Sequence, residues 1–476
     1  MDTDKLSMLT DFYELTMLNG FFLKGKADSV AVFDAFFRER REGGYCIACG
    51  LEQAAEYILN LSFSDDDISY LRSLNFFGEE FLKKLKDFKF SGDVRAIPEG
   101  TVVFPHEPLL IVKAPVFEAQ LIESTLLNLL NFQTMIATKA ARVNTASGGK
   151  SVIEFGLRRA QAPDAAYFGA RAAVIAGCDG TSNVLASKDL GTKPMGTHAH
   201  SWVMAFDSEL EAFRDYAEVY PQSCMLLIDT YDTLKSGLVN AITVFKELRA
   251  KGFTPLGVRL DSGDLAYLSK EVRKGLDEAG FQSAKIFASS DLDEYVISSL
   301  SHQGAKIDAF GVGTRLITGS PEASLGGVYK LAAFEKNKKL EPKVKVSDNP
   351  AKVTNPGEKD LFRFYDRTTH MALGDLITLK GETIDESKPF TLTHPTDRWK
   401  NTVLENFYAK PLYVDLIKNG KLVYDFPSIQ GARAHCKASL DSFWEEYKRI
   451  DNPQIYKVNL SDGLFELKQR LLLKGK

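Results

Sequence analysis

The stretch Pro255-Leu-Gly-Val-Arg-Leu-Asp-Ser-Gly-Asp264 predicts a short apolar strand that runs into a charged turn and then a helix. The strand pattern ends in Arg259 and Asp261, and Asp264 is placed to cap a helix that extends to about Glu278. In open α/β sheets and α/β barrels, ligands bind at the carboxyl ends of the strands. A charged pair at this position therefore indicates a functional site.

The same arrangement recurs along the middle of the chain. A spacing of roughly 17–32 residues between strand ends is the length of one βα unit, and Gly252, Gly280 and Gly304 are placed to end the intervening helices. About seven units in one run favour an incomplete α/β barrel over an open sheet. The expected strand ends are Val152–Phe155, Ala176–Asp179, Met195–His198, Met225–Asp229, Leu256–Asp261, Lys285–Ser289 and Ile307–Gly311.

The flanks of this region have a different pattern. A helix is expected over Asp11–Phe22, an aromatic strand over Val30–Phe37, and short β patterns over 335–425, including a hairpin around Asn419-Gly420. We therefore expect an α/β fold with an α/β barrel catalytic domain at 135–334. Residues 1–134 and 335–476 would form a mixed, largely β flanking domain built from both chain ends.

Composition limits the classes of partner and the compartment. The chain has 476 residues and a formal net charge of −4, which gives no electrostatic argument for nucleic acid or a membrane surface as a partner. No apolar run approaches the ~20 residues of a membrane span. The N-terminus lacks the pattern of a signal peptide, and the five cysteines are scattered, so we expect a cytoplasmic protein. Cys46-Ile-Ala-Cys49 lies in an apolar stretch, and we interpret it as packing.

Two predicted strand ends carry groups suited to an aromatic acid or to reactive chemistry. In Glu154-Phe-Gly-Leu-Arg-Arg159, Phe155 could stack on a flat ring while Arg158 holds its carboxylate through two hydrogen bonds. A core phenylalanine with two surface arginines is an equal alternative. In Gly196-Thr-His-Ala-His200, both histidines would lie on one strand face, as a metal pair, as one reactive histidine with a neighbour, or as structural residues.

Later segments are suited to phosphate. The glycine-rich strand exit Ala309-Phe-Gly311-Val-Gly313-Thr314 could bind a phosphate through backbone N–H groups. Ser289-Ser290, at the end of the preceding predicted strand, would add to the same phosphate site. Lys343–Gly357 is a polar loop with several lysines. This loop is either a solvated surface segment or a lid that supplies cations to a polyphosphate.

In this order, the motifs resemble nicotinate phosphoribosyltransferase, a family of type II phosphoribosyltransferases. The resemblance covers nearly the whole chain. It rests on seven segments: Thr10–Met17, Phe155–Gln161, Gly180–Asn183, Met195–Ser201, Val258–Asp264, Phe310–Thr314 and Lys345–Gly357.

The resemblance implies a reaction in NAD salvage. Nicotinate and phosphoribosyl pyrophosphate would give nicotinate mononucleotide and pyrophosphate, with coupled ATP hydrolysis. Mg²⁺ would be carried by the pyrophosphate, with no metal held by protein side chains. The protein would be a homodimer whose active sites share residues.

The resemblance also implies roles for individual residues. His200 would be a phosphohistidine formed from ATP, and the role of His198 stays open. Catalytic roles fall to His200, Asp261 and Arg259. Substrate-binding roles fall to Tyr13 (from the other subunit), Phe155, Arg158, Thr181, Ser182, Ser289, Ser290, Gly311, Gly313 and Thr314. Contacts with pyrophosphate or ATP fall to Arg38, Lys345 and Lys352.

Other functions remain possible from the sequence. Nicotinamide is the main alternative substrate, but the related nicotinamide enzyme has an aspartate where Ser182 stands, and serine tolerates a carboxylate. Quinolinate would need a denser basic pocket. From another class, His198 and His200 could mark a metal-dependent barrel hydrolase, which would need further histidines at strand ends. A purely binding role fits least, given so many polar strand ends.

Overall fold

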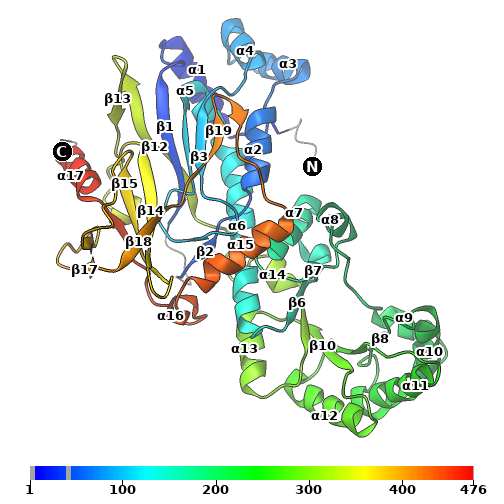
Figure 1. The fold of residues 1–476 in the computed structure, drawn as a ribbon. Coiled ribbons are helices and arrows are strands. Elements are labelled where there is room, and N and C mark those ends of the chain that lie inside the picture. The colour runs from blue at the N-terminus through cyan, green and yellow to red at the C-terminus, as the bar shows by residue number, and fades with distance from the viewer. Residues whose placement is uncertain (1–5, 39–43, 475–476) are drawn as a thin grey trace. The chain divides into compact units, whose positions relative to one another are not determined.

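The computed structural model describes residues 6–38 and 44–474. The chain divides into two compact units: unit 1 comprises Met1–Thr138 and Ser324–Lys476, and unit 2 comprises Lys139–Ala323 (Figure 1). Within the described ranges, no helix combines the length and the apolar character that crossing a bilayer requires.

Unit 2 is built on a parallel sheet of six strands. The strand order is β7-β6-β11-β10-β9-β8, and all five neighbouring pairs are parallel. Together with the separate, largely β unit 1, this sheet confirms the predicted fold class. The strands are β6 (Ser151–Glu154), β7 (Gly180–Thr181), β8 (Met225–Leu227), β9 (Gly257–Leu260), β10 (Lys285–Ser290) and β11 (Ala309–Val312).

Helices connect these strands, and several begin and end at the predicted residues. The Asp264 carboxylate accepts a hydrogen bond from the Tyr267 N–H at 3.0 Å, so it caps the next helix as expected. Gly252, Gly280 and Gly304 have φ of 84°, 80° and 73°, the left-handed backbone that ends a helix. The helical segments are η2 (Leu157–Arg159), α7 (Pro163–Ile175), α8 (Val184–Asp189), α9 (His200–Met204), α10 (Glu209–Val219), the π-helical η3 (Thr233–Gly237), α11 (Leu238–Ala250), α12 (Leu265–Glu278), α13 (Glu294–His302) and α14 (Thr314–Ile317).

Two of the seven predicted strands are wrong. Ala176–Asp179 completes the end of α7: Gly177 has φ of 114°, and the Cys178 N–H donates back to the Ala173 carbonyl at 2.9 Å. The strand β7 begins only after this cap. Met195–His198 makes one backbone bond to β7, from the Met195 N–H to the Thr181 carbonyl at 3.0 Å, and then turns into α9 without forming a strand.

Unit 1 is dominated by a seven-stranded sheet of order β13-β12-β1-β5-β3-β19-β20, accompanied by a four-stranded sheet of order β18-β14-β15-β21. Helices α1 to α5 and the start of α6 contribute to the main hydrophobic core together with the larger sheet. The strands are β1 (Val30–Phe37), β2 (Cys46–Ile47), β3 (Asp93–Ala96), β4 (Val102–Val103), β5 (Leu110–Pro115), β12 (Gly327–Lys336), β13 (Lys339–Pro342), β14 (Lys359–Asp366), β15 (Ala372–Leu379), β16 (Phe390–Thr393), β17 (Asn401–Leu404), β18 (Phe407–Pro411), β19 (Val414–Lys418), β20 (Lys421–Leu422) and β21 (Val458–Leu460).

The predicted N-terminal helix, aromatic strand and late hairpin are all present in unit 1. The hairpin joins β19 to β20 through Asn419 and Gly420, whose φ values of 48° and 68° fit a tight two-residue turn. The helices are α1 (Phe12–Leu23), α2 (Leu51–Asn60), α3 (Asp65–Ser73), α4 (Glu79–Lys86), α5 (Val116–Leu121), α6 (Glu123–Ala146, which ends in unit 2), η4 (Pro350–Lys352), α15 (Ile429–Asp441), α16 (Glu445–Lys448) and α17 (Asp462–Lys474).

Gly257, the first residue of β9, is the position in the parallel sheet where we expect a side chain to be least tolerated. Its φ is 154°, and a Cβ would lie 2.0 Å from the Lys285 carbonyl oxygen on β10. Gly252 is a matched control in the same unit, because it has φ of 84° but nothing within 4 Å of a built Cβ. We predict that Gly252→Ala costs about 1–2 kcal/mol through backbone strain alone. Gly257→Ala should lower the melting temperature clearly more than Gly252→Ala does. Equal decreases for the two variants would show that β10 moves away from the added methyl group without a loss of stability.

Candidate active site

A hydrogen-bonded charge network lies at the carboxyl ends of β9 and β10. The Arg259 guanidinium donates to Ser289 Oγ at 2.7 Å, to Asp261 Oδ1 at 2.8 Å and to Thr197 Oγ1 at 3.0 Å. Ser289 also donates to Asp261 Oδ1. The structure therefore brings three predicted site residues, Arg259, Asp261 and Ser289, into one network, as the strand-end argument expects. Thr197 joins them, although the sequence did not indicate a role for its side chain.

Asp261 is held as a carboxylate in this network. Partial burial raises its pKa, but the hydrogen bond from Ser289 and the positive charge of Arg259 outweigh burial and bring the pKa below its usual range. The Asp261 side chain is 31% exposed. A fixed anion that keeps this much access to solvent can stabilise positive charge that develops on a bound substrate.

A second carboxylate fixes the turn that carries Asp261. Asp229, which follows β8, accepts hydrogen bonds through Oδ2 from the Asp261 N–H at 3.0 Å and from Ser262 Oγ at 2.6 Å. Asp229 was predicted to lie at a strand end, without a role in the site. The signal that could have found it is the pair of acidic strand ends on β8 and β9, because these strands are neighbours in the sheet.

His200 faces the same network from the start of α9. Its Nδ1 lies 3.0 Å from Thr230 Oγ1, and its Nε2 lies 3.8 Å from Asp261 Oδ2. The His200 side chain is 38% exposed. The Thr230 hydroxyl therefore orients the ring so that one nitrogen faces Asp261. Thr230 is a further contact that the sequence did not indicate.

His198 has a different environment, and the prediction that it shares a strand face with His200 is wrong. Its ring is buried and lies edge-on to Tyr216, with ring centroids 4.6 Å apart. Its Nε2 accepts a hydrogen bond from the Leu227 N–H at 3.2 Å, so Nδ1 carries the proton and faces the Ala199 carbonyl at 3.3 Å. Burial, with the charges of Arg259 and His200, lowers the pKa of His198 to about 4. His198 is thus a neutral structural group that attaches this loop to β8.

Phe155 lies beside the charge network, directly after β6. Its ring centroid is 5.6 Å from that of Phe287 and 5.6 Å from the centre of the Arg259 guanidinium. A Cβ at Gly311 would lie 2.7 Å from the Phe155 ring. Gly311 therefore leaves the space that this ring occupies, a role additional to the phosphate contact expected from the sequence. Arg158 is exposed on η2, one short turn later.

Glu154 holds the segment that carries Phe155 and Arg158. Its buried carboxylate accepts hydrogen bonds from the Gly156 N–H and from Thr181 Oγ1, while its carbonyl accepts from the Ser182 N–H at 3.0 Å. Burial raises the pKa of Glu154, and the two hydrogen bonds oppose that shift. Thr181 and Ser182 thus lie beside the Phe155 segment. The part played by Glu154 was missed because two of its three partners, Thr181 and Ser182, come from a separate segment of the chain.

The remaining predicted residues of unit 2 lie at the ends of β10 and β11. Ser290 is the exposed last residue of β10. Gly313 precedes α14, and Thr314 is its exposed first residue. These positions border the strand ends that carry Ser289 and Gly311.

Four predicted residues belong to unit 1. Tyr13 is 45% exposed on α1, and partial burial with the negative charge of Glu123 raises its pKa. Lys352 is exposed at the end of η4. Arg38 and Lys345 lie near Lys330 of β12: burial, together with the charges of Lys345 and Arg38, lowers the pKa of Lys330. Lys330 is therefore a third cation beside two predicted phosphate contacts, and the sequence did not indicate it.

The metal-hydrolase alternative relied on His198 and His200 as a pair, but His198 is buried and its Nε2 is occupied by the Leu227 N–H. Within residues 6–38 and 44–474, no group of three or more His, Cys, Asp or Glu side chains is arranged to hold a metal ion. A hollow of about 810 Å³ in unit 1 is lined by residues that include Phe104, His394 and Tyr456, and its lining contains none of the predicted site residues.

The low pKa of His198 makes a testable prediction about stability. The usual pKa of histidine is about 6.5. Below that pH, this histidine becomes protonated in the unfolded chain but stays neutral in the folded chain. The folded protein therefore loses stability as pH falls from about 6.5 towards about 4. The loss should be on the order of a few kcal/mol. We predict that the melting temperature of His198→Gln falls less steeply over this range than that of the wild type. His302→Gln, which alters an exposed histidine on α13, should keep the wild-type slope. Parallel slopes for the wild type and His198→Gln would contradict the assignment.

Comparison with known proteins agrees with this geometry. Models of the nicotinate phosphoribosyltransferase (NAPRTase) family match residues 8–131 (N-terminal domain), 151–375 (family) and 358–468 (C-terminal domain). Nicotinate phosphoribosyltransferase of Bacillus subtilis (strain 168) is 45% identical over 468 residues, which cover 98% of this chain and 95% of the relative. The protein of the same name from Caenorhabditis elegans is 33% identical, with 98% of this chain and 93% of the relative covered.

Solved structures give the same result. The crystal structure of human nicotinic acid phosphoribosyltransferase superposes with a TM-score of 0.86 at 30% identity and covers 97% of this chain and 99% of that one. A nicotinate-nucleotide pyrophosphorylase from Pyrococcus furiosus shares the fold, with a TM-score of 0.72 at 23% identity and with 93% and 97% of the chains covered. The chain belongs to the nicotinate phosphoribosyltransferase family.

Proposed function

We propose that this protein transfers the phosphoribosyl group of phosphoribosyl pyrophosphate to the ring nitrogen of nicotinate, with ATP hydrolysis coupled to the transfer. The products are nicotinate mononucleotide and pyrophosphate. The observation that carries the proposal is the Arg259–Asp261–Ser289 network beside Phe155, because it places a fixed carboxylate next to an aromatic ring at the strand ends. Membership of the family supplies the reaction class.

Nicotinate binds through its ring and its carboxylate. The Phe155 ring is held between the strand ends by Phe287 and by the space at Gly311, and it offers one face to the pyridine ring. Arg158 is exposed one turn later and holds the carboxylate through two charge-assisted hydrogen bonds. In a homodimer, Tyr13 of the partner subunit covers the other face of the pyridine ring.

Asp261 serves the chemical step. Departure of pyrophosphate leaves positive charge on the ribose C1, and an anion placed nearby stabilises this charge more in the transition state than in the substrate. Arg259 fixes the Asp261 carboxylate and keeps it ionised. The 5-phosphate lies near Gly313 and Thr314, beyond the end of β11.

Cations from the protein and from Mg²⁺ offset the charge of the leaving pyrophosphate. Arg38, Lys345 and Lys352 are the protein groups proposed for pyrophosphate or ATP. Among the described residues, no group of three or more acidic, histidine or cysteine side chains is arranged to hold a metal ion. Following the family resemblance, we propose that Mg²⁺ enters bound to the pyrophosphate oxygens of the substrate. Mg²⁺ bound in this way withdraws negative charge from the leaving group.

His200 couples ATP to this reaction as a phosphohistidine. A ring nitrogen of His200 attacks the γ-phosphorus of ATP, an N–P bond forms, and ADP leaves as the P–O bond breaks. Water later takes the phosphoryl group and releases phosphate. Thr230 orients the His200 ring. Phosphorylation changes the charge of His200, and this change alters the electrostatic environment of the nearby Asp261 carboxylate, where the ribose binds.

An assay of the reaction tests the proposal directly. The purified protein is incubated with nicotinate, phosphoribosyl pyrophosphate and Mg²⁺, with and without ATP, and the mononucleotide is measured by liquid chromatography. We expect nicotinate mononucleotide in both reactions, formed faster with ATP, and much less product when nicotinamide replaces nicotinate. Nicotinamide used as well as nicotinate would make the protein a nicotinamide enzyme, and no product from either would reject the proposal.

The neighbouring arginines of η2 allow a matched prediction. Arg158→Ala should raise the KM for nicotinate by about 10–150-fold, because a charge-assisted contact worth roughly 1.5–3 kcal/mol is lost. Arg159→Ala removes an equally exposed charge one residue later and should change this KM by less than about threefold. Steady-state kinetics with phosphoribosyl pyrophosphate at saturation measure both. The reverse order would assign the carboxylate to Arg159.

A further inference from the structure

Residues 343–358, which we term the lysine loop, join β13 to β14 and carry Lys345 and Lys352. The loop has little regular structure beyond the short η4, and both lysines are exposed. A loop of this length gains a defined shape only from specific contacts, since its own backbone supplies few. The contacts that fix it therefore decide where its cations lie.

The base of the lysine loop is closed by a bulge in β12. Pairing with β1 passes from Val32–Ala333 to Phe33–Leu331, so Ala332 has no partner on β1. The Ala332 carbonyl instead accepts hydrogen bonds from the N–H groups of Lys343 and Gly357, both at 2.8 Å. One carbonyl thus holds both ends of the loop.

The second half of the loop is held by a buried cation. The side chain of Lys359 is 0% exposed, and its Nζ donates to the carbonyls of Asn355 (3.0 Å) and Gly357. The same Nζ lies 2.8 Å from Oδ2 of Asp34 on β1. All three donors of the ammonium group therefore have an acceptor. Burial raises the pKa of Asp34, and the charges of Lys359 and Arg95 oppose that shift.

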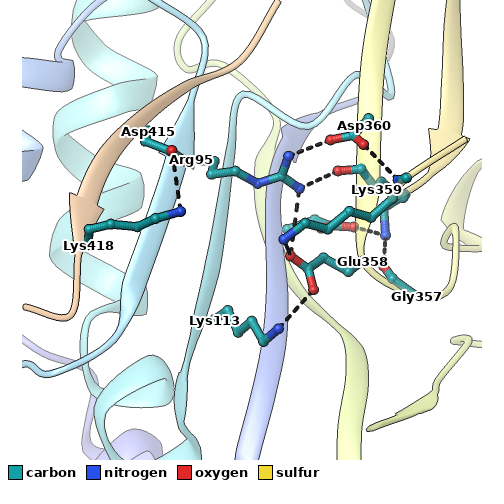
Figure 2. Close-up of polar contacts among 11 residues, drawn as sticks. Arg95, Lys113, Gly357, Glu358, Lys359, Asp360, Asp415 and Lys418 are labelled. Atoms are coloured by element: carbon teal, nitrogen blue, oxygen red, sulfur yellow. Dashed lines mark hydrogen bonds and ion pairs between the residues drawn. The ribbon is translucent and has the colours of Figure 1, made fainter. Parts of the chain in front are cut away.

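Neighbouring ion pairs attach the start of β14 to the larger sheet but do not reach the loop carbonyls. Arg95 of β3 donates to the Asp360 carboxylate and to the Lys359 carbonyl, and Lys113 of β5 lies 3.1 Å from Glu358 (Figure 2). Lys380 pairs with the other oxygen of Glu358. Lys359 is the member of this network that points to Gly357 (Figure 2).

The hydrogen bonds of Lys359 are linked to Lys345 through Thr354 and Asn355. Thr354, next to Asn355, accepts a hydrogen bond through Oγ1 from the Lys345 N–H at 2.9 Å. Lys345 then lies close enough to Lys330 and Arg38 for their charges to interact, and the Arg38 N–H donates to the Gly326 carbonyl at 3.2 Å, just before β12. Lys330 lies further along β12 as the ladder partner of Asp34 on β1, and its Nζ is 3.9 Å from Oε1 of Glu123. Glu123 offsets part of the repulsion among these three cations, and the rest stays unfavourable until a further anion binds. The loop therefore needs an anchor that holds Lys345 in place before the anion binds.

We propose that Lys359, paired with Asp34, is the positioning residue of the lysine loop and holds Lys345 beside Lys330 and Arg38 as a binding cluster for the pyrophosphate part of the substrate. The inference rests on the proposed function, which supplies the polyphosphate substrate. Lys359 does not itself touch that substrate. Its effect is to set the position of the loop before binding, which reduces the ordering cost of substrate capture.

The test uses a variant that removes both buried charges, Asp34→Asn/Lys359→Met, so that no unpaired ion is left inside unit 1. We expect the KM for phosphoribosyl pyrophosphate to rise about tenfold or more, the loss of roughly 1.4 kcal/mol of positioned charge contact. The KM for nicotinate should change less than about twofold, since Phe155 and Arg158 lie in unit 2. Hydrogen exchange of residues 343–357 should become faster.

Lys380→Met is the matched control, because it removes an exposed lysine of the same network that pairs with Glu358. It should leave both KM values and loop exchange unchanged. A purely structural role for Lys359 predicts a lower melting temperature in the double variant with unchanged KM values, and that result would overturn the positioning role. If the double variant does not fold, Lys359→Gln, which keeps a hydrogen-bond donor without the charge, takes its place with the same expectations.

Lys345→Met separates this inference from the proposed function. A raised KM for phosphoribosyl pyrophosphate in Lys345→Met, but not in the double variant, would reject the role of Lys359 alone. Unchanged KM values in Lys345→Met would reject the phosphate cluster, and with it the positioning role. In that case, continued formation of nicotinate mononucleotide by the wild type would leave the proposed reaction intact.

Discussion

The ionic contact between Arg259 and Asp261 is the interaction on which the candidate site depends. Both residues lie at the carboxyl end of one strand, β9. Hydrogen bonds from three other segments fix their positions: Ser289 on β10, Asp229 after β8 and Thr197 in the loop before α9. A carboxylate fixed in this way and kept ionised by an adjacent guanidinium costs little reorganisation when positive charge appears on the substrate. Phe155 and His200 each lie beside one member of this pair, Phe155 beside Arg259 and His200 beside Asp261.

The two units place their charges by different physical means. In unit 2, Arg259 and Asp261 are only partly buried and satisfy each other at the strand ends. In unit 1, the position of the exposed cation Lys345 depends on the buried pair Lys359 and Asp34. The Lys359 ammonium group of this pair donates hydrogen bonds to the loop backbone. A buried pair is weak evidence for stability, because desolvation offsets much of the attraction. Its value here is the specificity with which it fixes an otherwise irregular loop.

Sequence patterns predicted what depends on local chemistry. The strand–helix alternation, the Asp264 cap and the glycine helix ends were all recognisable, because each rests on residues a few positions apart. Met195–His198 was predicted to be a strand, yet Thr197 and His198 use their side chains to bond Arg259 and the β8 backbone, and no ladder forms. Glu154, Asp229, Thr230, Lys330 and Lys359 were missed for a related reason. Most of their partners lie on other strands or loops, and only Asp229 left a signal in the sequence, as one of two acidic strand ends on neighbouring strands.

We assign Asp261 to stabilising charge in the transition state rather than to binding substrate, and the kinetics of Asp261→Asn distinguish these two roles. Asparagine keeps the shape and can still accept from Arg259, but it removes the negative charge. We predict that kcat falls by about 100-fold or more, as for loss of one preorganised electrostatic group, while the KM values for nicotinate and phosphoribosyl pyrophosphate change only a few-fold. An unchanged kcat with a strongly raised KM would contradict it and make Asp261 a binding residue.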